Sequence, residues 1–245
     1  MADTSKPRKR RSRKAVAKPK PLRRITRAVR RVVLWSVAGV GGFVLVWTLL
    51  YALINPPTTA YMVSEGRRLG GVQHEWVPMD RIAPVMARAA VAAEDANFCL
   101  HWGLDVNAIR SAMERGRGGA STISQQVVKN VYLWHGRSWA RKSIEALWTP
   151  VTEVFWSKRR ILEIYLNVAE FDAGVFGVQA AAQHYFGVDA ANLTATQAAR
   201  LAAILPAPKE RSASNPGQFT RNRAAQIISG AETIAADGRA DCFQR

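Results

Sequence analysis

The chain has 245 residues, of which 48% are hydrophobic, and its formal net charge at pH 7 is +17. This length suits one substantial core with appendages and argues against two separate catalytic domains. Residues 1–31 hold 14 Lys and Arg against one acidic residue, Asp3, so the other 214 residues carry a net charge of only +4. A basic arm of this kind suits nucleic acid or anionic lipid, and the segment that follows it decides between the two.

The segment from Val32 to Ile54 contains 23 residues without a charge. As an α-helix with a rise of about 1.5 Å per residue it would be roughly 35 Å long, which is enough to cross a bilayer. The apolar part of a cleaved signal peptide is shorter, about 7 to 15 residues. We therefore predict an uncleaved transmembrane helix at 32–54, with a buried core helix as the alternative. The basic arm at 1–31 then places the N-terminus in the cytoplasm, and no nucleic acid is expected as a partner.

The predicted span is followed by a segment that cannot be helical and then by the rest of the chain. The sequence NPP at 55–57 cannot continue a helix, so we predict a linker at 55–75 and an extracytoplasmic domain at 76–245. Two cysteines, Cys99 and Cys242, are too few for a disulfide scaffold. The sequence leaves open whether they pair.

A helix is predicted just before the acidic pair Glu94 and Asp95. Asp80 can cap this helix. Its apolar residues recur at helical spacing: Ile82, Val85, Met86, Ala89 and Ala93. At about 100° per residue, Glu94 lies nearer to this apolar stripe than Asp95, which points away. A partly desolvated carboxylate has a raised pKa, as a general base needs, although an acidic pair at a helix end is more often a solvated surface feature.

The sequence RGRGGASTISQQVVKN at 115–130 predicts a glycine loop followed by a helix, because Thr122 and Gln125 fit a capping box. A glycine loop before a helix N-terminus offers N–H groups and the positive end of the helix dipole to phosphate oxygens. Lys129 and Arg137 add cations nearby. The alternative is an ordinary capped helix, and the loop lacks the GK[ST] of a Walker motif.

Residues 136–167 predict further helices. Arg141 and Glu145 are four residues apart on one helical face, where a surface ion pair is the usual interpretation. Pro150 should kink or end this helix. An amphipathic helix follows, and an alanine-rich helix is predicted over 178–186.

Five segments in this order resemble the peptidoglycan glycosyltransferase family: Glu94 and Asp95 with Phe98, His101 and Gly103, then GASTISQQVVKN, RSWARKSIE, YLNVAEFDAGVFGVQAAAQHYFG and LAAILPAPKERSASNPGQFTRNR. The resemblance covers about residues 76 to 228 and is greatest to the monofunctional biosynthetic transglycosylases of Gram-negative bacteria. It implies an all-α, lysozyme-like glycosyltransferase domain with a smaller membrane-facing lobe, preceded by one N-terminal transmembrane helix. The SxxK and KTG motifs of the penicillin-binding domain in bifunctional relatives do not occur in the sequence.

The resemblance also implies a reaction. Such enzymes polymerise lipid II by passing a growing glycan chain from undecaprenyl diphosphate to the 4-hydroxyl of the next lipid-linked disaccharide, with inversion at the anomeric carbon. Glu94 matches the family's catalytic base. Glu145 matches a second important glutamate, which would orient Arg141, Lys129 or a metal.

Other site residues are carried over in the same way. Lys129, Arg137 and the loop at Gly119 match positions that contact phosphate. The donor site is expected to include Ser121, Thr122, Gln125 and Gln126. A divalent cation, Mg²⁺ or Mn²⁺, is expected near Glu94 and Asp95, and no organic cofactor is expected.

The expected partners are lipid II, the growing glycan chain, the membrane and other cell-wall synthases. The expected location is the inner membrane, with the catalytic domain in the periplasm. Ala120 departs from the glycine of many bifunctional relatives, which could alter the flexibility of the loop. Two alternative functions remain: a lysozyme-like lytic transglycosylase, which would not need a phosphate-directed loop, and an inactive membrane-anchored scaffold.

Overall fold

The computed structural model describes residues 21–114, 116, 121–136 and 138–244. Two compact units are distinguished, Met1–Val44 and Leu45–Arg245. Gly119 and Arg137, both predicted to contact phosphate, lie outside the described residues.

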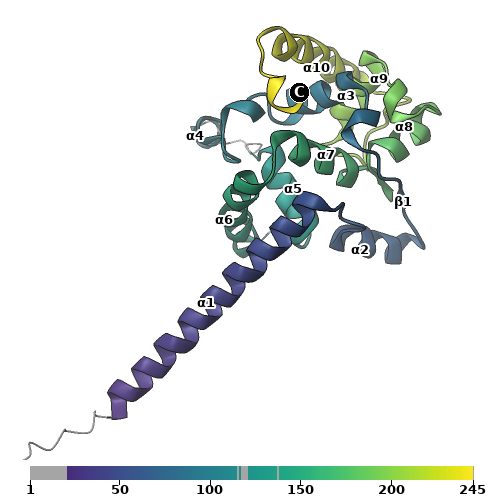
Figure 1. Cartoon of the computed structure of the whole chain (residues 1–245). Helices are drawn as coiled ribbons and strands as arrows, with labels where there is room; N and C mark the ends of the chain where they lie inside the picture. The colour runs from purple at the N-terminus through teal and green to yellow at the C-terminus, as the bar shows by residue number, and fades with distance from the viewer. Residues whose placement is uncertain (1–20, 115, 117–120, 137, 245) are drawn as a thin grey trace, which may run out of the picture. The chain divides into compact units, whose positions relative to one another are not determined.

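The first unit consists, in its described part, of most of helix α1 (Pro21–Leu53), the long helix of Figure 1. Ile25–Leu53 is long and apolar enough to cross a membrane, and large side chains such as Trp35 and Val40 are exposed along it. A helix that is apolar on all sides and uncovered by protein fits a membrane anchor. The predicted span at 32–54 agrees at its C-terminal end, but the helix itself begins earlier, within the basic arm.

The second unit is mainly helical. Its described elements are α2 (Ala60–Leu69), β1 (Gln73–His74), η1 (Met79–Arg81), α3 (Pro84–Glu94), η2 (Phe98–Leu100), α4 (Val106–Glu114), α5 (Ile123–Tyr132), α6 (Trp139–Phe155), α7 (Lys158–Val168), β2 (Glu170–Asp172), β3 (Val175–Phe176), α8 (Val178–Phe186), η3 (Ala190–Asn192), α9 (Ala195–Ile204), α10 (Gln218–Ala236) and α11 (Asp241–Gln244). The all-α class is confirmed, and so is one N-terminal apolar helix within the part of the chain that the structure describes.

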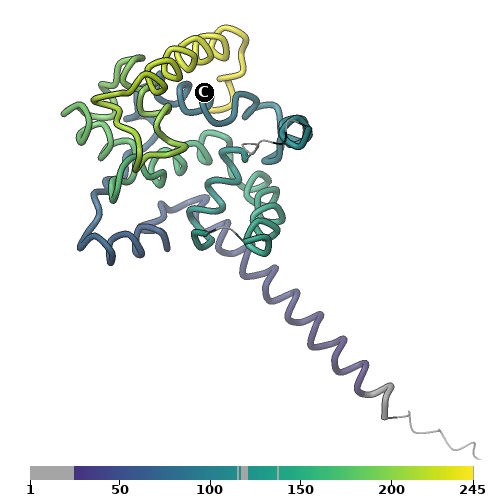
Figure 2. The backbone as a smooth tube through the Cα atoms, turned by 180° about the vertical axis from the view of Figure 1, so that it is seen from behind, coloured from purple at the N-terminus to yellow at the C-terminus, as the bar shows by residue number. Residues whose placement is uncertain are grey.

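Helix packing divides the second unit into two groups. Helices α3, α9 and α10 pack on one another, while α5 packs on both α6 and α7, as can be followed from behind in Figure 2. Buried side chains from both groups, among them Met86, Ile123, Tyr165 and Leu201, belong to one continuous apolar core. The end of α3 and the start of α5 therefore pack on the same core. This places the motif of Glu94 and Asp95 beside the α5 residues of the motif GASTISQQVVKN.

The segment predicted as a linker, 55–75, is part of the folded unit. It contains α2 and β1, and β1 pairs with β3 in a small sheet of order β1-β3-β2. Tyr61 of α2 donates a hydrogen bond of 2.6 Å to Glu170, and Glu65 forms a salt bridge of 2.8 Å with Lys209. These contacts fix α2 on the domain.

The last turns of α1 also belong to the second unit. Trp148 and Trp156 donate their indole N–H groups to the side chain and the carbonyl of buried Thr48, at 2.9 and 2.8 Å. Arg160 donates to the carbonyl of Ile54 at 2.7 Å. Arg160 also donates from Nε and Nη2 to the carbonyl of Tyr51, one of the last carbonyls of α1, which lack intrahelical partners. These donors join the end of α1 to the domain by direct hydrogen bonds.

The prediction that Asp80 caps α3 is wrong, and of the two outcomes predicted for Pro150, a kink or a helix end, the second does not occur. Asp80 does not cap α3: the N-cap is Ala83 with Pro84 in the first turn, and Asp80 pairs with Arg159 instead. Helix α6 does not end at Pro150 but continues to Phe155. Pro150 is exposed, and the helix continues past it although the carbonyl of Ala146 loses its N–H donor.

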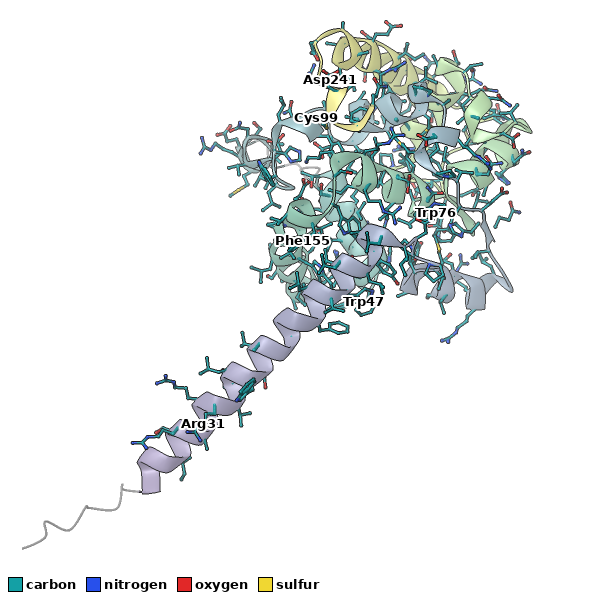
Figure 3. All side chains as sticks on the ribbon, viewed as in Figure 1. Arg31, Trp47, Trp76, Cys99, Phe155 and Asp241 are labelled. Atoms are coloured by element: carbon teal, nitrogen blue, oxygen red, sulfur yellow. A yellow bond between two sulfur atoms is a disulfide. The ribbon has the colours of Figure 1, made fainter. Side chains whose placement is uncertain are left out.

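The structure pairs the two cysteines that the sequence left open. Cys99 of η2, labelled in Figure 3, and Cys242 of α11 form a disulfide, with their Cα atoms 5.7 Å apart and a sequence separation of 143. Next to it, Phe243 is fully buried with its ring 6.3 Å from that of Phe98. The disulfide therefore holds the C-terminal helix against the segment that follows the acidic pair.

Candidate active site

Glu94 lies at the C-terminal end of α3 and is half-buried. Its carboxylate accepts a hydrogen bond of 2.8 Å from the side-chain amide of Gln126 on α5. Burial raises the pKa of Glu94, while the bond from Gln126 and the positive charges of Arg223 and Lys129 act in the opposite direction. Within the described residues Glu94 forms no salt bridge, so its carboxylate is placed to accept a proton.

Asp95 has a different environment from its neighbour. One carboxylate oxygen lies 2.8 Å from His101 Nε2, and the other accepts the backbone N–H of Ile123 at 3.0 Å. Asp95 is 7% exposed, so the prediction that it points away from the apolar side is wrong. The reason is that Asp95 is the C-cap, with φ −162° and ψ 69°, and a helical angle of 100° per residue no longer applies there.

The metal ion predicted near this pair stays a prediction. Both oxygens of Asp95 already accept protein donors. No group of three or more His, Cys, Asp or Glu that could hold an ion occurs among the described residues.

The capping box predicted at the start of α5 is confirmed. Thr122 is the N-cap, its side chain accepts from the Gln125 N–H, and the Gln125 side chain accepts from the Thr122 N–H. The Thr122 hydroxyl also donates to the carbonyl of Gly103 at 2.6 Å. Gly103 has φ +80°, and a Cβ there would lie 2.5 Å from a Thr149 methyl carbon. Only glycine fits this close approach to α6, and the hydrogen bond from Thr122 to Gly103 joins the first two motifs.

Most of the predicted site residues line a single cavity of about 450 Å³. Its walls are formed by Ala93, Glu94, Ser121, Gln125, Gln126, Lys129, Arg141, Lys142, Glu145, Pro206 and Arg223. Thr122, predicted to bind substrate, is buried under the cap instead and does not line the cavity. The cavity brings together side chains from α3, α5, α6 and α10.

Glu145 organises the cations on the α6 side of the cavity. It is only 2% exposed and pairs with Arg141 at 2.7 Å and with Lys142. Lys142 also donates to the Ser121 hydroxyl at 3.1 Å, and Arg141 Nε donates to the carbonyl of Gly136 at 3.0 Å. The interpretation of Arg141 and Glu145 as a surface pair is wrong, because α5 covers this face of α6.

Lys129 extends from α5 into the same cavity. Burial lowers its pKa, and the negative charge of Glu145 opposes that change. Four cations and two carboxylates line the cavity, which leaves an excess of positive charge for an anionic ligand. A partly desolvated cation interacts more strongly with such a ligand than one in bulk water.

Sequence reasoning missed two of these cations, Lys142 and Arg223. Lys142 lies three residues before Glu145, and this spacing on one helix face was a signal that could have found it. Arg223 is the last residue of the fifth segment that resembles the family, which was a signal that could have found it, and the packing of α10 on α3 brings it to the cavity.

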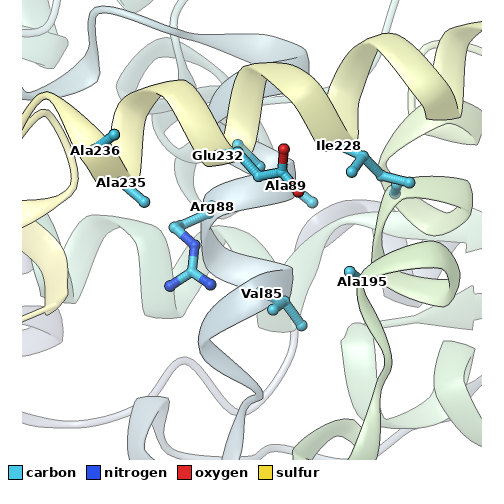
Figure 4. Close-up of a pocket in the computed structure, with 10 residues that line it drawn as sticks. Val85, Arg88, Ala89, Ala195, Ile228, Glu232, Ala235 and Ala236 are labelled. Atoms are coloured by element: carbon cyan, nitrogen blue, oxygen red, sulfur yellow. The ribbon is translucent and has the colours of Figure 1, made fainter.

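A second cavity of about 420 Å³ lies between α3, α9 and α10. Figure 4 shows Val85 and Arg88 on α3 facing Glu232 and Ala235 on α10. Much of its lining is alanine, and only one cation and one carboxylate reach it. No converging set of polar groups supports a reaction there.

Comparison with known proteins shows the family of the chain. Residues 63–232 match the family model described as Transglycosylase. The chain belongs to this transglycosylase family. The match includes the end of α3, the cations of α5 and α6, and Arg223 of α10.

Several relatives of this transglycosylase are proteins named biosynthetic peptidoglycan transglycosylase. The protein from Jannaschia sp. (strain CCS1) is 57% identical over 234 residues, which cover 95% of this chain and 98% of the relative. The one from Caulobacter vibrioides is 47% identical over 199 residues, or 79% and 87% of the two chains. A relative from Pseudomonas putida KT2440 is 46% identical over 215 residues, or 83% and 89%.

Proposed function

We propose that this protein is a monofunctional peptidoglycan glycosyltransferase of cell-wall synthesis that polymerises lipid II into glycan strands. The names of its relatives support the activity over nearly the whole chain. The observation that carries the mechanism is the shared cavity, in which a carboxylate without a salt bridge, Glu94, faces a cluster of cations.

The proposed step is an inverting displacement at the anomeric carbon of the donor. The 4-hydroxyl oxygen of the acceptor attacks that carbon and forms the new glycosidic bond, while its proton passes to Glu94. The bond from the carbon to the diphosphate oxygen breaks, and undecaprenyl diphosphate leaves with the electron pair. Glu94 suits the role of base because burial raises its pKa toward the working pH.

The leaving group departs as an anion and needs positive charge in place of the carboxylic acid of a glycosidase. Lys129, Arg141 and Lys142 line the cavity and supply that charge. Glu145 holds the last two of these cations in place. Fixed charges of this kind cost little reorganisation as the bond breaks, which is the physical basis of their effect on rate.

A divalent cation such as Mg²⁺ or Mn²⁺ remains part of this proposal as an ion that enters with the substrate. Mg²⁺ keeps several waters and commonly binds substrate phosphates. The diphosphate oxygens of the lipid would carry it, since the described residues provide no site of their own. The bound ion would neutralise charge on the leaving group.

We propose further that the protein is a single-pass protein of the inner membrane, with its N-terminus in the cytoplasm. The basic arm before the apolar helix supports this orientation. The disulfide between Cys99 and Cys242 supports an oxidising compartment for the domain. Protease added to spheroplasts should digest residues beyond about 60 and spare an N-terminal epitope, and protection of the domain would contradict the topology.

The anchor has a physical advantage for this substrate. Both donor and acceptor are held in the membrane by polyprenyl tails, so an anchored enzyme searches in two dimensions at a higher effective concentration. We also propose other cell-wall synthases of the same membrane as partners.

One assay tests the activity. Detergent-solubilised, full-length protein is incubated with labelled lipid II or with preformed glycan. Longer strands from lipid II support synthesis. Shorter soluble fragments from preformed glycan would identify a lytic enzyme, and no change in either would identify a scaffold.

A further inference from the structure

Arg223 approaches Glu94 from a different wall of the cavity than the other cations. The cavity cations are Lys129 on α5, Arg141 and Lys142 on α6, and Arg223 on α10. Helix α6 packs on α5, whereas α10 packs on α3 and α9. The position of Arg223 relative to Glu94 is therefore set by the contact of α10 with α3.

The guanidinium of Arg223 joins these two helices. Its Nη2 donates a hydrogen bond of 2.9 Å to the carbonyl of Ala93, in the last turn of α3 directly before Glu94. The last carbonyls of a helix have no intrahelical donor and carry partial negative charge, so a cation there is favourable. Half-buried Arg223 thus satisfies the carbonyl next to Glu94.

The charge of Arg223 is not neutralised by a carboxylate. Arg141 and Lys142 both pair with Glu145, whereas Arg223 has no salt bridge among the described residues. Its one hydrogen bond there is to a backbone carbonyl, which leaves the positive charge facing the cavity and Glu94.

We propose that Arg223 is a positioning residue for the transfer: from α10 it fixes the last turn of α3, and with it Glu94, and it faces the Glu94 carboxylate with a positive charge. The inference rests on the proposed role of Glu94 as the base.

Several groups act on Glu94 from the elements around it: Asp95 next to it, Gln126 and Lys129 on α5, Tyr165 on α7 and Arg223 on α10, with Arg141, Lys142 and Glu145 farther along the cavity. Burial raises the pKa of Glu94, and among the charges that lower it Arg223 acts most strongly. Loss of Arg223 should therefore raise the pKa of Glu94 further. Since a base must be deprotonated, activity should then be lost below a higher pH.

The test uses full-length Arg223→Gln with labelled lipid II, and kcat and KM are measured from about pH 6 to about pH 9. We expect kcat at about pH 7 to fall about tenfold while KM stays within about twofold. The deficit should shrink as the pH rises, because Glu94 deprotonates again. A merely structural defect would give the same deficit at every pH.

Two variants complete the experiment. Arg223→Lys keeps the charge. The acidic limb of its pH profile, where kcat falls as the pH is lowered, should therefore lie near that of the wild type. Arg221→Gln changes an exposed arginine of the same helix that donates to the carbonyl of Pro216, away from α3, and should leave kcat and its pH profile unchanged.

The inference is overturned by an unchanged kcat for Arg223→Gln, by a deficit independent of pH, or by a rise in KM alone. If Arg223→Gln does not fold, Arg223→Lys decides: an acidic limb at the wild-type position supports the inference, and one displaced to higher pH overturns it. Near-normal activity of Glu94→Gln would instead refute the proposed base, so the two failures can be told apart.

Discussion

Two cavities of similar volume, about 450 and 420 Å³, border the same helix, α3. Val85, Arg88 and Ala89 of α3 line the second cavity, while its last residues, Ala93 and Glu94, line the first. In the first, charged side chains from four helices converge. In the second, most of the lining is alanine. Space alone therefore does not identify the site; the convergence of charges does.

Glu94 of the first cavity and Glu232 of the second differ in their exposure to solvent. Glu94 is half-buried, accepts from Gln126 and has a raised pKa. Glu232, on the second cavity, is exposed to solvent. An exposed carboxylate keeps its hydration, whereas burial of Glu94 makes its charged form more costly and its proton affinity higher.

The largest expected effect is the loss of the base. Glu94→Gln keeps the size of the side chain but cannot take a proton, so kcat on lipid II should fall by roughly 10²- to 10⁴-fold. Glu232→Gln makes the same chemical change at the second cavity and should leave kcat within about twofold of the wild type. A Glu94→Gln rate within about threefold of the wild type, an effect under about 1 kcal/mol, would refute the mechanism.

The same variant should not lose stability at neutral pH. The pKa of Glu94 is raised in the folded state, so this group favours folding below its unfolded pKa, and that contribution is lost as pH rises through the folded pKa. Neutral Gln avoids this loss. The Tm of Glu94→Gln near pH 7 should equal or exceed that of the wild type. A lower Tm would mean that the carboxylate has a structural role.

Asp95→Asn, by contrast, should lose stability together with activity, because Asp95 accepts two protein donors.

The next effect concerns the cations. Lys129→Ala should lower kcat on lipid II by about 10²-fold, as loss of one stabilising donor does in other sites. It should also weaken binding of phosphoglycolipid inhibitors that mimic the donor. Arg88→Ala, which removes the cation of the second cavity, is the matched control and should change neither quantity. A near-normal rate for Lys129→Ala would show that another cation meets the leaving group.

A smaller effect on activity is expected from the disulfide. Replacing both Cys99 and Cys242 by Ser should lower the free energy of unfolding by about 2–4 kcal/mol, measured with denaturant. The kcat of the folded variant should stay within about threefold of the wild type, because neither sulfur lines the cavity of Glu94. A large loss of kcat at full folding would show that α11 holds the acidic pair in place.

The smallest effect is expected from filling the second cavity. Ala231→Leu adds apolar volume next to Ile228 and Val85, and the free energy of unfolding should change by no more than about 1 kcal/mol. The kcat should be unchanged. A marked loss of activity would mean that the packing of α10 on α3 transmits strain to Glu94. The packing around the second cavity would then affect the reaction in the first.

Some features were predictable from the sequence because they depend on neighbouring residues. The apolar span needs only hydropathy and length. The capping box of Thr122 and Gln125 needs only their spacing, and it formed as predicted. Glu94, Lys129 and Glu145 were found through motifs, and the structure brings all three to one cavity.

The tertiary structure decided the rest. The burial of Asp95 depends on the backbone leaving the helix at that residue and on the α5 N-terminus that meets it. The pairing of Cys99 with Cys242 depends on the contact of α11 with η2 across 143 residues. Arg223 reaches Glu94 because α10 packs on α3. Helical periodicity and capping are local and can be read along the chain, whereas these contacts join residues far apart in sequence and exist only once the core has formed.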